Sequence, residues 1–171
     1  TDSHCVSYQL SKHIKIKGKA PWTQQHLCDL LLHITEELYE DDPENNPYSD
    51  YDGAFQEKVL IVGFTAAAIA QLCRELQVPI HIVWKGCKIQ SFTPERPEYE
   101  AVALYIWGDH CYTVEDSTVK RAIMKEPVSE PRSHDQEVLA TIGRRANSTP
   151  ASQYWDTYTK LAPGHFHSND L

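Results

Sequence analysis

The segment E-A-V-A-L-Y-I-W-G-D-H-C-Y-T-V-E-D, residues 100–116, constrains the fold more than any other part of the chain. Its two runs of branched and aromatic residues are typical of strands, and the Gly-Asp pair between them fits a type II′ turn, in which glycine comes first. We therefore predict a β-hairpin that turns at Gly108 and Asp109 and places His110 at the open end of a strand. A histidine in an apolar strand is usually structural, but one at a hairpin tip is also placed to reach a cleft.

Four further segments have the spacing of apolar residues that is typical of an amphipathic helix. They are residues 5–14, 22–40, 66–77 and 117–125. Thr23 and Thr65 stand where the second and third helices would begin, and their hydroxyl groups suit an N-cap. Asp116 and Ser117 offer N-caps to the fourth. We therefore expect four helices, three of which begin at a side-chain cap.

A second hairpin is predicted by I-H-I-V-W followed by K-G-C-K-I-Q-S-F, with its turn at Lys85 and Gly86. The run F-Q-E-K-V-L-I-V leads to Gly63 and receives no element of its own. His81 and Cys87 are most simply structural residues of these strands. Helices and hairpins together predict an α+β fold, with N-terminal helices packed on a small, mostly antiparallel sheet.

Residues 36–53 form the most acidic part of the chain, with eight acidic side chains, two prolines, three tyrosines and no basic residue. This composition predicts a loop rather than a regular element. Two interpretations stay open. The segment is a solvated surface excursion, as charge runs usually are, or it is a docking surface for a basic partner.

The length of 171 residues suits one domain with an appended tail. We place the domain at residues 1–126 and treat residues 127–171 as an appended helical and linker segment. No apolar run approaches the roughly 18 residues of a membrane span, and no secretory leader is visible. We therefore expect an intracellular protein, cytoplasmic or nuclear, without a membrane partner. Thr1 is not an initiator, which indicates a piece of a longer protein.

Five cysteines without a C-x-x-C pair argue against both a disulfide framework and a zinc knuckle. We expect reduced thiols and no metal or other cofactor, since H-F-H near the end of the chain lacks a third ligand at metal spacing. The formal charge of −8 would repel a phosphate backbone, and the basic stretch K-H-I-K-I-K-G-K is typical of a solvated helix end. We therefore do not expect this domain to bind nucleic acid.

Cys5 differs from the other four cysteines because it stands where the polar start T-D-S-H-C becomes the first predicted helix. The positive end of a helix dipole and the unpaired N–H groups of a first turn both favour a thiolate. A nucleophilic cysteine also needs a general base from elsewhere in the fold, and His110 is the candidate. The other interpretation of Cys5, a buried structural thiol, stays open.

The motifs around these two residues resemble those of known cysteine proteases. D-S-H-C-V-S-Y-Q-L is similar to the D-G-x-C start of ovarian-tumour-type deubiquitinases, and H-C-Y-T-V resembles the H-[WY]-x-x-V strand of those enzymes and of Josephin domains. The layout also resembles viral-tegument-like deubiquitinases and the protease-like domains of mobile-element proteins. Ser3 and Cys111 depart from the pattern, which has glycine after the aspartate and, in most families, an aromatic residue after the histidine. The resemblance covers about residues 2–125 and implies a papain-like fold.

The resemblance implies roles for Cys5, His110 and Asp2 but assigns no orienting acid, so Asp109 and Asp116 are judged by their positions. Cys5 would attack the scissile carbonyl, and His110 would act as base and then as acid. Asp2 would support the loop that forms the oxyanion hole, or cap the first helix. Asp109 either orients the imidazole or is a plain turn residue. Asp116 lies about 20 Å from His110 along an extended strand, at roughly 3.3 Å per residue, and is better explained as a helix cap.

We therefore expect a thiol-dependent peptidase, a deubiquitinase that removes ubiquitin or a ubiquitin-like modifier from its substrates. The acidic residues of 36–53 would attract the basic face of such a modifier and speed the encounter. Two alternatives stay open. The chain is a catalytically inactive protein-binding module of the same fold, or an accessory domain of a mobile-element replication protein.

Overall fold

The computed structural model describes residues 4–14, 22–42, 44, 46–84, 86–107, 110–129 and 139–140. Within these ranges, the description excludes the side chains of His4, Cys5, His13, Trp107, His110, Leu139 and Ala140. The helices are α1 (His4–His13), α2 (Gln24–Tyr39), α3 (Phe55–Val62), α4 (Ala66–Leu76) and α5 (Ser117–Lys125). The strands are β1 (Phe64–Thr65), β2 (Ile80–Trp84), β3 (Cys87–Phe92), β4 (Val102–Trp107), β5 (His110–Thr113) and β6 (Leu139–Ala140).

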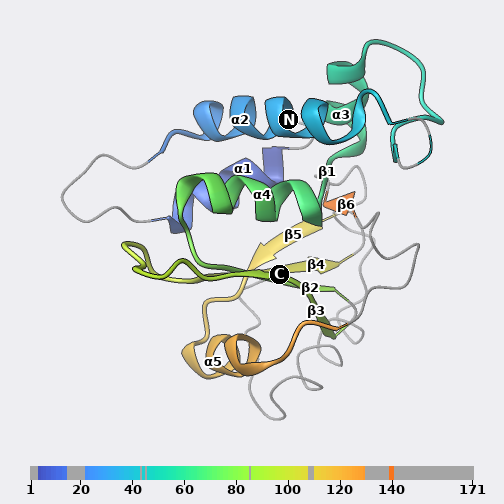
Figure 1. The fold of residues 1–171 in the computed structure, drawn as a ribbon. Helices are drawn as coiled ribbons and strands as arrows, with labels where there is room; N and C mark the ends of the chain where they lie inside the picture. The colour runs from blue at the N-terminus through green and yellow to red at the C-terminus, as the bar shows by residue number, and fades with distance from the viewer. Residues whose placement is uncertain are drawn as a thin grey trace.

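A four-stranded sheet forms the middle layer of the described chain, with strand order β3-β2-β4-β5. The hairpins β2–β3 and β4–β5 are antiparallel, as predicted, and the central pair β2–β4 is parallel. Helices α1, α2 and α4 cover one face of the sheet, and α5 covers the other (Figure 1). The α+β class is thereby confirmed, with a small mixed sheet.

Side-chain caps begin three of the helices at the predicted residues. The hydroxyl oxygen of Thr23 accepts from the backbone N–H of His26, and that of Thr65 accepts from Ala68, both at 3.1 Å. The carboxylate of Asp116 accepts from the N–H groups of Thr118 and Val119 at 2.8 and 2.9 Å. Asp116 is thus the helix cap that its distance from His110 had suggested.

Two predictions differ from the structure. Helix α2 runs to Tyr39, as the helix predicted over 22–40 requires, so the acidic loop begins after Tyr39 and not at residue 36. Phe55–Val62, which received no element, forms α3, because Val59 and Val62 pack inward within one helical turn and Gly63 ends the helix at a φ of 113°. Tertiary packing has decided the structure of this short run, whose branched residues are equally common in strands.

The sheet separates two apolar cores. The larger one lies between the sheet and the N-terminal helices, and its members include Leu10, Leu31, Ile69, Ile80 and Leu104. The smaller one lies between the sheet and α5, and consists of Val83, Ala103, Tyr105, Val114, Val119 and Ile123. Each strand of the central pair therefore supplies alternate side chains to both cores, which explains its nearly continuous apolar sequence.

Two short parts of the C-terminal segment contact the main body. Strand β6 pairs with β1 in an antiparallel register, Phe64 opposite Ala140. The backbone N–H of Ser129 donates to the carbonyl of Lys88 at 2.8 Å, beside a parallel bridge between Lys88 and Val128. Residues beyond position 126 thus supply backbone partners to β1 and β3.

Candidate functional site

Cys5 is the second residue of α1, in the first turn of the helix. Val6, Leu10 and Ile14 are completely buried and hold the helix on the larger core. A residue in this position lies beside backbone N–H groups that have no partner within the helix. Such a position favours a negatively charged sulfur.

His110 is the first residue of β5, the edge strand of the four-stranded sheet. It pairs with Trp107 of β4, so the hairpin places it next to the predicted turn. Cys111 and Thr113 of the same strand are buried. Pairing with β4 and the buried side chains of Cys111 and Thr113 therefore fix the backbone of β5.

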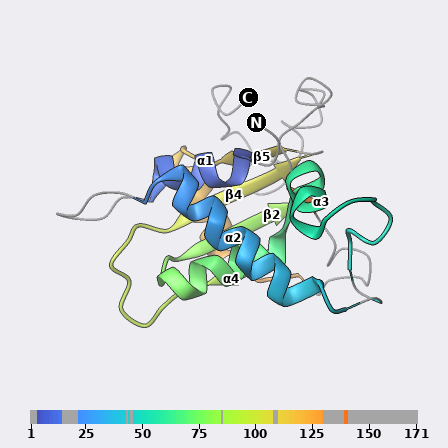
Figure 2. The same ribbon diagram turned by 90° about the horizontal axis from the view of Figure 1, so that it is seen from above.

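Helix α1 packs on β5, and two contacts define their relative direction (Figure 2). The hydroxyl group of Thr113 donates to Gln9 Oε1 at 2.7 Å, and Lys12 Nζ lies 4.0 Å from Glu115 Oε1. Gln9 contacts Thr113, the last residue of β5, and the later residue Lys12 contacts Glu115, two positions after the strand, so α1 and β5 run in the same direction. Cys5 begins about 6 Å before Gln9, at ~1.5 Å per helical residue, and His110 about 10 Å before Thr113, at ~3.3 Å per strand residue. The backbones of both residues therefore lie at the same end of the pair.

Four predicted site residues differ in what the structure describes of them. The backbones of Cys5 and His110 are described, whereas their side chains are not. Asp2 and Asp109 lie outside the described residues. Their proposed roles stay predictions.

Two other cysteines differ from Cys5 in their surroundings. Burial raises the pKa of the Cys73 thiol to about 12. Burial, together with the nearby carboxylate of Asp29, also raises the pKa of Cys28. Both thiols are therefore protonated at neutral pH and act as core residues of α2 and α4.

A buried polar cluster on the α5 side of the sheet was missed by sequence reasoning. His81 Nδ1 lies 3.0 Å from Ser91 Oγ and 3.2 Å from Lys88 Nζ. A serine hydroxyl beside an imidazole suggests a nucleophile and base, but here a lysine shares the same ring nitrogen. Burial, then Lys88 and Lys120, lower the pKa of His81 to about 4, so the ring is a poor base. The cluster does not suit hydrolytic catalysis.

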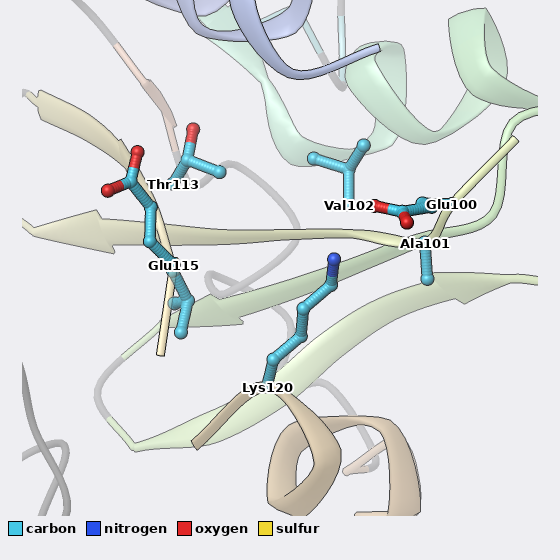
Figure 3. A pocket seen from close by; sticks show the side chains of 7 residues that line it. Glu100, Ala101, Val102, Thr113, Glu115 and Lys120 are labelled. Carbon is cyan, nitrogen blue, oxygen red and sulfur yellow. The ribbon is translucent and has the colours of Figure 1, made fainter. Parts of the chain in front are cut away.

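A pocket of about 260 Å³ lies at the end of β5 opposite to His110. It is lined by Glu100, Ala101, Val102, Thr113, Val114, Glu115 and Lys120. Lys120 extends into it from α5, and Glu100 and Glu115 stand on either side (Figure 3). The two exposed carboxylates and the lysine leave little apolar surface for a ligand.

The acidic loop that follows α2 is anchored at Tyr48, which is completely buried. Its hydroxyl group donates to the carbonyl of Gly63, and its ring packs edge-on against Tyr39 and Phe55 at 6.1 and 5.5 Å between centroids. The backbone N–H of Tyr48 also donates to Asn46 Oδ1 at 2.8 Å. The exposed carboxylates of Asp50 and Asp52 are thus carried on a loop fixed to the larger core.

Within the described part of the chain, no group of three histidine, cysteine or acidic side chains could hold a metal ion. In the same residues, no helix has both the length and the apolar composition needed to cross a membrane. Comparison of the chain with protein-family models, with curated proteins and with solved structures found no match.

Proposed function

We propose that the chain is a papain-like cysteine peptidase in which Cys5 is the nucleophile and His110 the general base. The observation that carries this proposal is the parallel packing of α1 on β5, which begins both elements at one end. A cysteine in the first turn of a helix and a histidine at the start of the strand on which that helix packs are positions from which thiolate chemistry is possible. Asp109 would orient the imidazole, and Asp2 would support the loop before α1.

The reaction would proceed in two stages. His110 takes the proton of the Cys5 thiol, and the thiolate adds to the carbonyl carbon while the C=O electron pair moves onto oxygen. Backbone N–H groups at the start of α1 stabilise this oxyanion. The C–N bond then breaks, and His110 gives its proton to the leaving amine. Water hydrolyses the thioester, passes a proton to His110 and frees Cys5.

The resemblance to deubiquitinases makes ubiquitin or a ubiquitin-like modifier the proposed substrate. Charge supports this choice, because the anchored acidic loop would attract a basic protein surface and speed its encounter with the enzyme. The net charge of the chain, −8, acts in the same direction.

The test uses ubiquitin with a thiol-reactive group at its C-terminus and intact mass spectrometry. We expect a single adduct with the native chain, and none with Cys5→Ala. Cys87→Ala is the matched control, because Cys87 is a partly exposed thiol in β3, and it should form the adduct normally. An adduct that survives in Cys5→Ala would exclude Cys5 as the nucleophile. No adduct, while iodoacetamide still labels Cys5 rapidly at pH 7, would exclude ubiquitin and retain the peptidase.

A second function, a catalytically inactive binding module, is favoured by the anchoring of the acidic loop at Tyr48. In this case Cys5→Ala should bind ubiquitin as well as the native chain does, and neither should cleave it. Asp50→Asn with Asp52→Asn should weaken that binding, measured by isothermal titration calorimetry. The matched control, Glu95→Gln with Glu98→Gln, neutralises two exposed carboxylates between β3 and β4. Equal weakening by both pairs would exclude the loop as the docking surface.

A further inference from the structure

Lys88 in β3 connects three parts of the molecule, although it is only 3% exposed. Its ammonium group donates to the carbonyl of Met124 in the last turn of α5 at 3.2 Å and lies 3.2 Å from His81 Nδ1 in β2. Its backbone carbonyl accepts from the N–H of Ser129. One buried lysine therefore joins the sheet to α5 and to the segment that follows α5.

While Lys88 carries its full charge, His81 must be neutral for this contact to exist. An ammonium group has only protons to donate, so His81 Nδ1 accepts from Lys88 and the ring proton is on Nε2. The hydroxyl group of Ser91 lies 3.0 Å from the same nitrogen and competes for its lone pair. A second proton on the ring would occupy Nδ1 and remove the acceptor.

The charged neighbours of His81 also oppose a protonated ring. Lys88 approaches from β3 and Lys120 from α5, and both disfavour an imidazolium at this position. Burial lowers the pKa of Lys88, and the carboxylate of Glu126, at the end of α5, acts in the opposite direction. The neighbouring strand β4 places Ala103 opposite His81, with no charge. The positive groups around His81 thus come from β3 and α5, and β4 adds no charge opposite it.

We infer that His81 and Lys88 form an acid-sensitive latch that holds α5 against the sheet. A proton taken from solvent by His81 Nδ1 breaks the contact with Lys88 and adds a third positive charge beside Lys88 and Lys120. Movement of α5 away from the sheet separates Lys120 from this charge and returns water to both buried side chains. The smaller core, with Tyr105 at its centre, is then exposed.

The test is hydrogen exchange, read by mass spectrometry at pH 7.5 and pH 5 and corrected for intrinsic rates. His81 has a pKa of about 4 while α5 is closed and the ordinary value of 6.5 when α5 is open. Between pH 7.5 and pH 5, the fraction of molecules with α5 open should therefore rise roughly 30-fold. His81→Gln keeps an acceptor oxygen but cannot titrate, so it should abolish this rise. Amides of α4, on the opposite face, should change little. An equal rise in α4, or an unchanged rise in His81→Gln, would overturn the latch.

A second measurement needs no variant. Long-range ¹H–¹⁵N spectra of the histidine rings at pH 7 report which nitrogen carries the proton. The latch requires a neutral His81 with its proton on Nε2. A proton on Nδ1, or a doubly protonated ring at pH 7, would contradict it.

Discussion

At the scale of single residues, Tyr48 shows how one side chain gives structure to a loop that its sequence describes only as acidic. The ring fills space between Tyr39 and Phe55, and the hydroxyl group satisfies the carbonyl of Gly63 at the end of α3. Composition predicts the loop but not its anchor, because the three tyrosines of the segment look alike in sequence. Tyr51, by contrast, is 43% exposed.

Tyr48 substitutions should separate packing from hydrogen bonding. Tyr48→Phe keeps the ring and loses one buried hydrogen bond, so we expect a loss of about 1–2 kcal/mol in the free energy of unfolding. Tyr48→Ala also leaves a cavity, and we expect about 3–5 kcal/mol. Urea unfolding measures both. Tyr51→Ala is the control and should cost under about 1 kcal/mol; a similar loss at both positions would contradict the anchor.

His81 and Lys88 show which properties of a single residue can be predicted from the sequence and which cannot. A structural role was predicted for His81, and its burial and bonds confirm it. No local signal marks Lys88 as buried, because a lysine in a strand is usually exposed. Its burial follows from the register that places Val83 opposite Lys88 and from the end of α5 above them. Both depend on contacts with other elements, which the sequence of one strand does not predict.

At the scale of elements, prediction succeeded where the signal was local. Apolar periodicity and the caps Thr23, Thr65 and Asp116 predicted α2, α4 and α5, and runs of branched and aromatic residues joined by glycine-containing turns predicted both hairpins. The parallel pairing of β2 with β4 has no comparable signal, because it joins two hairpins across an intervening loop. Neither the packing of α1 on β5 nor the relative direction of the two elements can be predicted from a single segment.

The N-caps of α2 and α4 should differ in their contribution to stability. Thr65 caps α4 and also shares a hydrogen bond with the hydroxyl group of buried Tyr39 at 2.8 Å, whereas Thr23 is exposed and only caps α2. Thr23→Ala should cost about 1 kcal/mol. Thr65→Ala should cost about 2–3 kcal/mol, because it also leaves the Tyr39 hydroxyl without this partner. Equal shifts in urea unfolding would show that the Tyr39 contact contributes nothing.

At the scale of the whole molecule, the described residues form a four-stranded sheet with a core on each face, and part of the C-terminal segment pairs with β1 in a second, two-stranded sheet. The predicted domain of residues 1–126 contains both described cores. The sequence of residues 127–171 has the composition of a linker, yet Ser129 and β6 supply partners to β3 and β1. Composition does not predict such pairing, because it is made by backbone N–H and C=O groups, which nearly every residue has.

Truncation should test the role of this segment. A chain that ends at Glu126 should still fold, since both cores remain, but we expect it to lose about 1–3 kcal/mol because β1 and β3 lose backbone partners. A chain that ends at Ala140 keeps both contacts and serves as the matched control, with stability close to that of the full chain. Identical urea midpoints for the two truncated chains would contradict a structural role for β6 and Ser129.

The central claim is that Cys5 and His110 form a thiolate–imidazole pair at the common end of α1 and β5. The rate of Cys5 alkylation by iodoacetamide, followed from pH 4 to pH 10 by peptide mass spectrometry, tests it most directly. We predict a thiolate already present below pH 7, and a shift of the profile to higher pH in His110→Asn. A single rise near pH 8.5, unchanged in His110→Asn, would describe an ordinary thiol and contradict the pair.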